Sequence, residues 1–468
     1  MGKATANQSK LTVAQGLLYG SAHYGVGISA LVYTSWYTRR YCPVDNASAT
    51  ILPMAWITTA FMIVKLLDGL SGPVFGYLSD NTRTRWGRRI PYILFGTIPM
   101  CIALLLIWTP PTSILAPNSI PLFAVFCILT LIFWLSYTAV QTPIFSLLPE
   151  IATSNDDRIK LSMYQSIFML VSSIIGYVMA PVLVQKFGFA VMGAVFVAMT
   201  AVSLYLPGFL LKEKYVPPEE TSAEKQSFFS SIGAALKNRA YLIYIISKLF
   251  AQIGFQLIMI SVAYIVPTIF KKPDTYIAII MMGTVVATIA SFFLVQALCK
   301  KYSKRGITIF GMAIMGAFLP VLFFMGQYDL SITIGPLTIT ETMIGLALFT
   351  IQGFPAAVIM VLQSPIVADT IDIDEIETGT RREAVYFGIH GMIFKFGLAI
   401  AGLIMGQLCA KCGYTVENHL GVDLIPLAAS ASVIIGAVIL IWYPVDKKKE
   451  EWIRSVLDSH GAAGTEQG

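Results

Sequence analysis

Two ionisable residues, Lys65 and Asp68, lie in an apolar stretch that begins near Ile51. A charge at membrane depth costs roughly 2.5–3.5 kcal/mol on insertion scales, so such residues usually face the interior of a helix bundle and serve a function. A spacing of three residues puts both side chains on one face of a helix, where they can partly neutralise each other. A buried carboxylate can hold a cation or carry a proton. The alternative is a static ion pair between Asp68 and Lys65.

A dense basic turn follows, with Asp80 ahead of four cations: Arg83, Arg85, Arg88 and Arg89. Positive charges next to a membrane span would serve as a topology signal in any case. A topology signal needs only the positive charges and does not explain why an acidic residue precedes them at this spacing. We therefore interpret the turn as a gating latch, in which Asp80 and the arginines bond across the ends of neighbouring helices when that side is closed.

The composition identifies an integral membrane protein. Of the 468 residues, 56% are hydrophobic and 12% are charged, whereas soluble domains carry about 25% charged residues. The apolar runs are long enough to cross a bilayer as helices of about 20 residues, and the alternation of a β-barrel strand is absent. We predict an all-α protein that lies in a lipid bilayer. The net charge of +6 does not indicate nucleic-acid binding, because the Lys and Arg residues are distributed by membrane side.

About twelve transmembrane helices are predicted, and one long polar connection divides them six and six. The spans run near 14–38, 51–78, 90–109, 119–149, 161–185, 188–211, 240–270, 276–299, 306–326, 336–369, 385–410 and 422–444. The predicted domains are an N-terminal bundle at 1–211, a cytoplasmic linker at 212–239, a C-terminal bundle at 240–444 and a cytoplasmic tail at 445–468. Small residues such as Gly20 and Gly27 would let helices approach closely.

The distribution of basic residues predicts the orientation. With these boundaries, 23 of the 32 Lys and Arg residues fall on the side of the two termini and 6 on the other side. The remaining three, Lys65, Lys248 and Lys395, lie inside spans. This bias predicts a multi-pass protein of the inner or plasma membrane with both termini in the cytoplasm.

The sequence contains no recognisable catalytic set. It has no nucleotide-phosphate loop, and its four His residues have neither metal-ligand spacing nor a nucleophile partner. His23 and His390 lie in spans, where we favour hydrogen-bonded packing over contact with a substrate. We expect no enzymatic activity, no cofactor and no metal other than a transported Na⁺.

Several motifs in both halves, taken together, resemble the glycoside-pentoside-hexuronide:cation symporters (melibiose-permease-like) of the major facilitator superfamily. These motifs are Asp68–Pro73, Gly76–Arg89, Tyr137–Pro143, Ala368–Glu375, Thr378–Glu383 and Phe394–Gly397. The resemblance implies the major facilitator fold, with two six-helix bundles and a central site. It also implies symport of a small organic solute, a sugar, glycoside or sugar acid, driven by Na⁺ or H⁺ through alternating access.

The resemblance also implies roles for individual residues. Asp68 and Thr138 would bind the coupling cation, and Lys65 or Lys395 would balance the charge. The residues expected to contact the solute are Tyr24, Tyr137, Gln141, Phe145, Gln363 and Lys395. Asp372, Arg381 and Arg382 would form a second latch, for which a solvated loop is the alternative.

The chain departs from the family pattern at several of these positions. Gly72 stands where galactoside-transporting members have a second cation-binding carboxylate, and Gly25 and Gln141 stand where they have sugar-binding acids. Phe145 and Met360 replace tryptophans. These changes leave open a lysolipid or amphipath carrier and an uncoupled facilitator. We expect a monomer.

Overall fold

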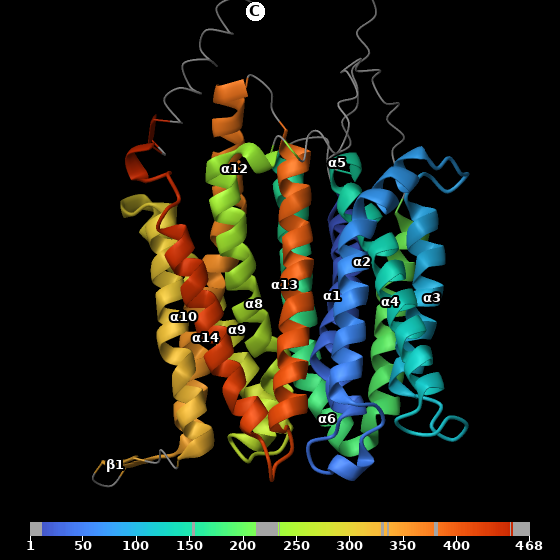
Figure 1. Ribbon diagram of the computed structural model, residues 1–468. Coiled ribbons are helices and arrows are strands. Elements are labelled where there is room, and N and C mark those ends of the chain that lie inside the picture. Colours follow the sequence, from blue (N-terminus) through green and yellow to red (C-terminus); the bar gives the residue numbers. More distant parts are fainter. Residues whose placement is uncertain are drawn as a thin grey trace, which may run out of the picture. The chain divides into compact units, whose positions relative to one another are not determined.

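Long helices make up most of the chain that the structure describes (Figure 1). The computed structural model describes residues 12–151, 155–211, 233, 235–328, 332–334, 337–378, 382–449 and 451–452. The chain divides into two units, residues 1–222 and 223–468. The division falls inside the connection predicted at 212–239.

Unit 1 is helical throughout its described elements. These are α1 (Val13–Tyr41), the short 3₁₀ helix η1 (Ala47–Ala49), α2 (Met54–Asn81), α3 (Ile90–Trp108), α4 (Ile120–Ser146), α5 (Leu148–Ile151) and α6 (Asn155–Leu210). The first helix begins at a capping box. The Thr12 hydroxyl accepts a hydrogen bond from the main-chain nitrogen of Gln15, and the Gln15 side-chain oxygen accepts one from the main-chain nitrogen of Thr12.

Unit 2 contains seven long or medium helices and one hairpin among its described residues. Its elements are α8 (Arg239–Thr268), α9 (Thr275–Lys301), α10 (Lys304–Gln327), β1 (Ile332–Ile334), β2 (Leu337–Ile339), α11 (Glu341–Ile351), α12 (Gly353–Thr378), α13 (Glu383–Cys412) and α14 (Leu420–Leu440). The two strands pair antiparallel, with Ile332 opposite Ile339.

The described helices account for twelve membrane spans. Ten segments are both long and apolar enough to cross a bilayer. One of them is two helices, because α6 changes direction at Gly188, whose φ of 80° is accessible mainly to glycine. The 29-residue α1 is long enough to cross but is richer in Tyr, Ser and Gly. The nearly all-helical architecture is confirmed, and the ten candidate spans agree with the predicted count of about twelve once α6 is divided and α1 is included.

The tenth predicted span was wrong in its boundaries. We expected one helix over 336–369, but residues 337–339 form a strand and the helical part is broken between α11 and α12. The second helix also continues to Thr378. Asp372 and Asp374 therefore lie on a helix and not in a solvated loop.

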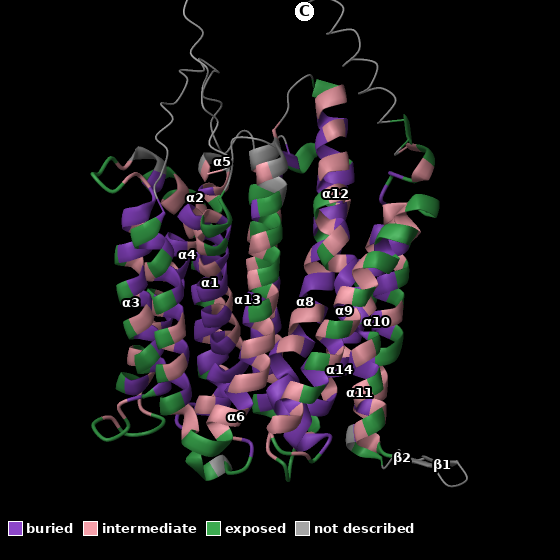
Figure 2. Cartoon of the chain, turned by 180° about the vertical axis from the view of Figure 1, so that it is seen from behind, coloured by how far each residue is buried: buried purple, intermediate pink, exposed green. Residues whose placement is uncertain are grey.

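Close helix approach holds each unit together. In unit 1, a Cβ atom on Gly20 of α1 would come within 2.4 Å of the Phe168 ring of α6, and one on Gly27 within 2.5 Å of the Ser172 hydroxyl. The predicted role of these small residues is thus confirmed. In unit 2, α8 is the most extensively buried helix and packs against α13 and α14 (Figure 2).

Candidate functional site

Asp68 is fully buried on α2, and both of its carboxylate oxygens accept hydrogen bonds. Lys65 Nζ, one turn earlier on the same helix, lies 2.7 Å from Asp68 Oδ2. The Thr138 hydroxyl of α4 donates to Oδ1. Sequence reasoning named all three residues, and the fold brings them together inside unit 1. The cluster combines a carboxylate, a hydroxyl and a cation at membrane depth.

Lys65 has a second favourable contact besides the carboxylate. Its Nζ atom lies over the ring of Trp134, 3.4 Å from the ring centroid, and the side chain is 3% exposed. A cation over an indole face gains about 0.5–2 kcal/mol, more when it is desolvated. The ammonium group is therefore stabilised on one side by Asp68 and on the other by the Trp134 ring.

The predicted solute-contacting residues of unit 1 differ in exposure. Tyr137, Gln141 and Phe145 are spaced four residues apart on α4 and so share one helix face. Tyr137 is buried, Gln141 is half-buried and Phe145 is exposed. The Phe145 ring meets His23 of α1 edge-on, with 4.9 Å between centroids.

The Tyr24 hydroxyl and His23 Nε2 are among the buried polar atoms on α1 that have no hydrogen-bond partner among the described residues. A buried polar group without a partner costs about 1–3 kcal/mol, so a polar ligand that satisfied either atom would gain that energy. Tyr24 was predicted as a solute contact, whereas His23 was assigned to packing.

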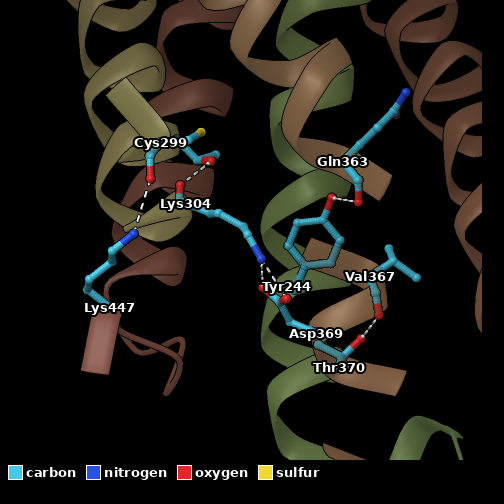
Figure 3. A network of polar contacts seen from close by, with 9 residues as sticks. Tyr244, Cys299, Lys304, Gln363, Val367, Asp369, Thr370 and Lys447 are labelled. Carbon is cyan, nitrogen blue, oxygen red and sulfur yellow. Dashed lines mark hydrogen bonds and ion pairs between the residues drawn. The ribbon is translucent and has the colours of Figure 1, made fainter. Parts of the chain in front are cut away.

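Unit 2 contains a second buried polar cluster, built from three helices. Lys248 of α8 is 4% exposed, and its Nζ donates to Gln363 Oε1 of α12 at 2.9 Å and to the ring of His390 of α13. The Tyr244 hydroxyl donates to the main-chain oxygen of Gln363 at 3.3 Å (Figure 3). Sequence reasoning predicted a solute contact for Gln363 but gave no role to Lys248, which it only placed inside a span.

A pocket opens beside this cluster. Its polar lining includes Tyr244, Lys248, Gln363 and Thr308, and its apolar lining comes from α8, α10 and α12. The empty volume is about 300 Å³, part of it open to the outside.

Two ion pairs lie near the ends of α10 and α12 that we predict to be cytoplasmic. Lys304 contacts both carboxylate oxygens of Asp369, at 2.6 and 2.5 Å (Figure 3). Arg382 Nη1 lies 2.9 Å from Asp374 Oδ2. Asp372 and Arg382 were both predicted to belong to a latch. The described partner of Arg382 is Asp374, which was not singled out, and the latch role of Asp372 stays a prediction.

The remaining predicted gating residues have varied environments. Arg83 and Arg85 are exposed, and the Arg85 guanidinium lies 4.6 Å from the Trp86 ring centroid. Arg88 is half-buried and Arg89 is buried at the start of α3. The side chain of Asp80 and all of Arg381 lie outside the described residues, so their latch roles stay predictions.

Lys395 is half-buried on α13 of unit 2. Its predicted pairing with Asp68, which lies in unit 1, is not tested and stays a prediction. The described residues contain no group of three His, Cys, Asp or Glu side chains that could hold a metal ion.

Ten segments of membrane length, in two units that each contain a buried lysine cluster, identify a multi-pass membrane protein. A family model described as MFS/sugar transport protein matches residues 18–447. The chain belongs to this family, and its resemblance to the glycoside-pentoside-hexuronide:cation symporters is confirmed. Its relatives are transporters and not enzymes.

Individual relatives are distant but span nearly the whole chain. The isoprimeverose transporter of Lactiplantibacillus pentosus is 24% identical over 94% of this chain and 91% of its own length. The glucuronide carrier protein homolog of Escherichia coli is 23% identical over 93% of each chain. The crystal structure of the nucleoside transporter NupG is similar in fold, with a TM-score of 0.63 and 12% identity over 92% of this chain and 99% of that one.

Proposed function

We propose that this transporter is a symporter, in which Na⁺ or H⁺ drives the uptake of a small sugar-type solute, a glycoside or a sugar acid, by alternating access. The observation that carries the proposal is the fully buried Asp68 carboxylate, held between Lys65 and the Thr138 hydroxyl. The names of the relatives, which include sugars and a glucuronide, support a sugar-type solute over a lysolipid or other amphipath.

The surroundings of Asp68 allow its ionic partner to change. A coupling cation that binds the carboxylate takes the place of the Lys65 ammonium, which is a point charge on a flexible stem. The Trp134 face, 3.4 Å from Nζ, keeps the displaced ammonium partly stabilised. The Thr138 hydroxyl can turn its oxygen lone pairs toward a cation. A proton is the simpler load, because it neutralises the carboxylate directly.

The solute contacts in this proposal are neutral hydrogen-bonding side chains, one aromatic ring and one cation. In unit 1 they are Tyr24, Tyr137, Gln141 and Phe145; in unit 2 they are Gln363 and Lys395. The ion pairs of Lys304 with Asp369 and of Arg382 with Asp374 would close the cytoplasmic end of unit 2. The protein would work as a monomer in the inner or plasma membrane, with both termini in the cytoplasm.

The test is ion-driven accumulation in proteoliposomes with a panel of sugars, glycosides and sugar acids. We expect Asp68→Asn to abolish accumulation driven by an imposed Na⁺ or H⁺ gradient, while solute-for-solute exchange continues. The matched control is Asp423→Asn, which removes an equally buried carboxylate held by His419 and Gln327 and should keep gradient-driven accumulation. Unchanged accumulation in Asp68→Asn would refute the coupling role.

One observation favours an uncoupled facilitator as a second candidate. The 2.7 Å pair of Lys65 with Asp68 already neutralises the carboxylate, and Gly72 supplies no second one, although a Cβ atom there would meet nothing within 4 Å. A facilitator would bring an uncharged solute inside only to the external concentration under any ion gradient. Accumulation above that concentration distinguishes the symporter from it.

A further inference from the structure

Lys248 is a deeply buried lysine of α8 whose described contacts include no carboxylate. The residue is 4% exposed, and its Nζ donates to the amide oxygen of Gln363 at 2.9 Å and contacts the ring of His390. An ammonium group carries three N–H donors, so these two neutral partners leave the third donor unused. Burying a charge is costly unless an opposite charge and a full set of hydrogen bonds compensate it.

The charge balance found at the other deeply buried lysine cluster has no counterpart at Lys248. In unit 1, Lys65 has the carboxylate of Asp68 at 2.7 Å. In unit 2, the described acidic residue that follows Gln363 along α12 is Asp369, and this residue is paired with Lys304. Among the residues that the structure describes, an anion for Lys248 would therefore have to come from outside the chain.

The pocket beside this lysine limits the size of such an anion. Lys248 is the one charged residue of its described lining, which also includes Tyr244 and Thr308 and the apolar side chains of Met312 and Leu362. The cavity that remains for water-sized particles is about 20 Å³. A sugar ring does not fit into this space, whereas a water molecule or a small ion does.

We propose that Lys248 binds a monatomic anion, chloride, in the pocket lined by α8, α10 and α12. The third N–H of Nζ donates a charge-assisted hydrogen bond to the ion, and the apolar walls strengthen the attraction because they lower the local dielectric constant. The Tyr244 hydroxyl, whose hydrogen bond to the main-chain oxygen of Gln363 is long at 3.3 Å (Figure 3), turns its proton toward the ion. The site lies in unit 2 and is independent of the cation coupling proposed for Asp68.

Equilibrium dialysis of radiolabelled chloride against the purified full-length protein in lipid nanodiscs tests the proposal. Gluconate replaces chloride so that the ionic strength stays constant. We expect saturable binding of one chloride ion per chain. Bromide should displace it, whereas gluconate should not, because its carbon chain exceeds the cavity. Lys248→Met should weaken chloride binding at least about tenfold, since it removes both the charge and the donor.

Lys411→Met is the control, because it removes an exposed positive charge of the same unit and should leave the chloride affinity unchanged. The absence of saturable binding, an affinity that survives Lys248→Met, or equal displacement by gluconate would overturn the proposal. If Lys248→Met does not yield folded protein, Tyr244→Phe removes only one hydroxyl and should weaken chloride binding about threefold. An unchanged affinity in that variant would overturn the proposal as well.

Discussion

Replacing Lys65 by methionine separates a static ion pair from a cation site. Lys65 and Asp68 have side chains only 3% and 0% exposed, and removing one partner of a buried pair costs about 3–5 kcal/mol. The lost cation–π contact with Trp134 adds about 0.5–2 kcal/mol, while methionine keeps most of the apolar stem. We therefore expect Lys65→Met to lose about 3.5–7 kcal/mol in a buffer without Na⁺ at alkaline pH.

The second half of this prediction is recovery by the coupling ion. In the variant, Asp68 has lost the Lys65 ammonium, so Na⁺ or a proton can bind it without competition from that group. A ligand present at 100 times its Kd returns about 2.7 kcal/mol of stability. Thermal unfolding in detergent should show a higher Tm for Lys65→Met when choline is replaced by Na⁺, or when the pH is lowered, and a smaller shift in the wild type.

The outcome separates the alternatives because each predicts a different pattern. A static pair predicts the loss of stability with no recovery by either ion. Lys411→Met should change stability by no more than about 0.5 kcal/mol, as exposed substitutions usually do. A Lys65→Met protein that is as stable as the wild type would refute the claim that breaking this buried ion pair destabilises the fold.

Three further predictions concern packing, gating and energy source. Gly20→Leu should lower the yield of folded protein, measured by size-exclusion chromatography. A Cβ atom at this position would come within 2.4 Å of Phe168, and overpacking of this kind costs about 1–3 kcal/mol or more. A variant with normal yield and normal Tm would contradict this prediction. Asp369→Asn breaks the ion pair with Lys304. Backbone amides near the predicted cytoplasmic end of α12 should then exchange hydrogen about tenfold faster, which corresponds to about 1.4 kcal/mol. Unchanged exchange rates would exclude a role of this ion pair in closing the cytoplasmic end. If one cation enters with one singly charged sugar acid, the charges cancel and an imposed membrane potential should not affect uptake. Cation-coupled uptake of a neutral glycoside should instead gain about 2.3 kcal/mol per 100 mV. Uptake of the acid that depends on the potential would contradict a ratio of one cation to one acid.

The sequence predicted those features that depend on neighbours along the chain. Apolar runs of membrane length identify spans because the bilayer imposes the length. Lys65 and Asp68 could be paired because a spacing of three residues fixes their proximity on any helix. Gly20 and Gly27 indicated close packing, although not the helix against which they pack.

Contacts between distant segments were beyond that reasoning. Lys248 is 115 residues from Gln363 and 142 from His390, and no local spacing links them. The only available signal was a lysine inside a span with no acidic residue one turn away. The hairpin of β1 and β2 was missed because its residues Ile332–Ile339 are as apolar as a helix end. Asp374 was not singled out as a gating residue, because the charge pattern does not show which acidic residue of the segment Arg382 contacts.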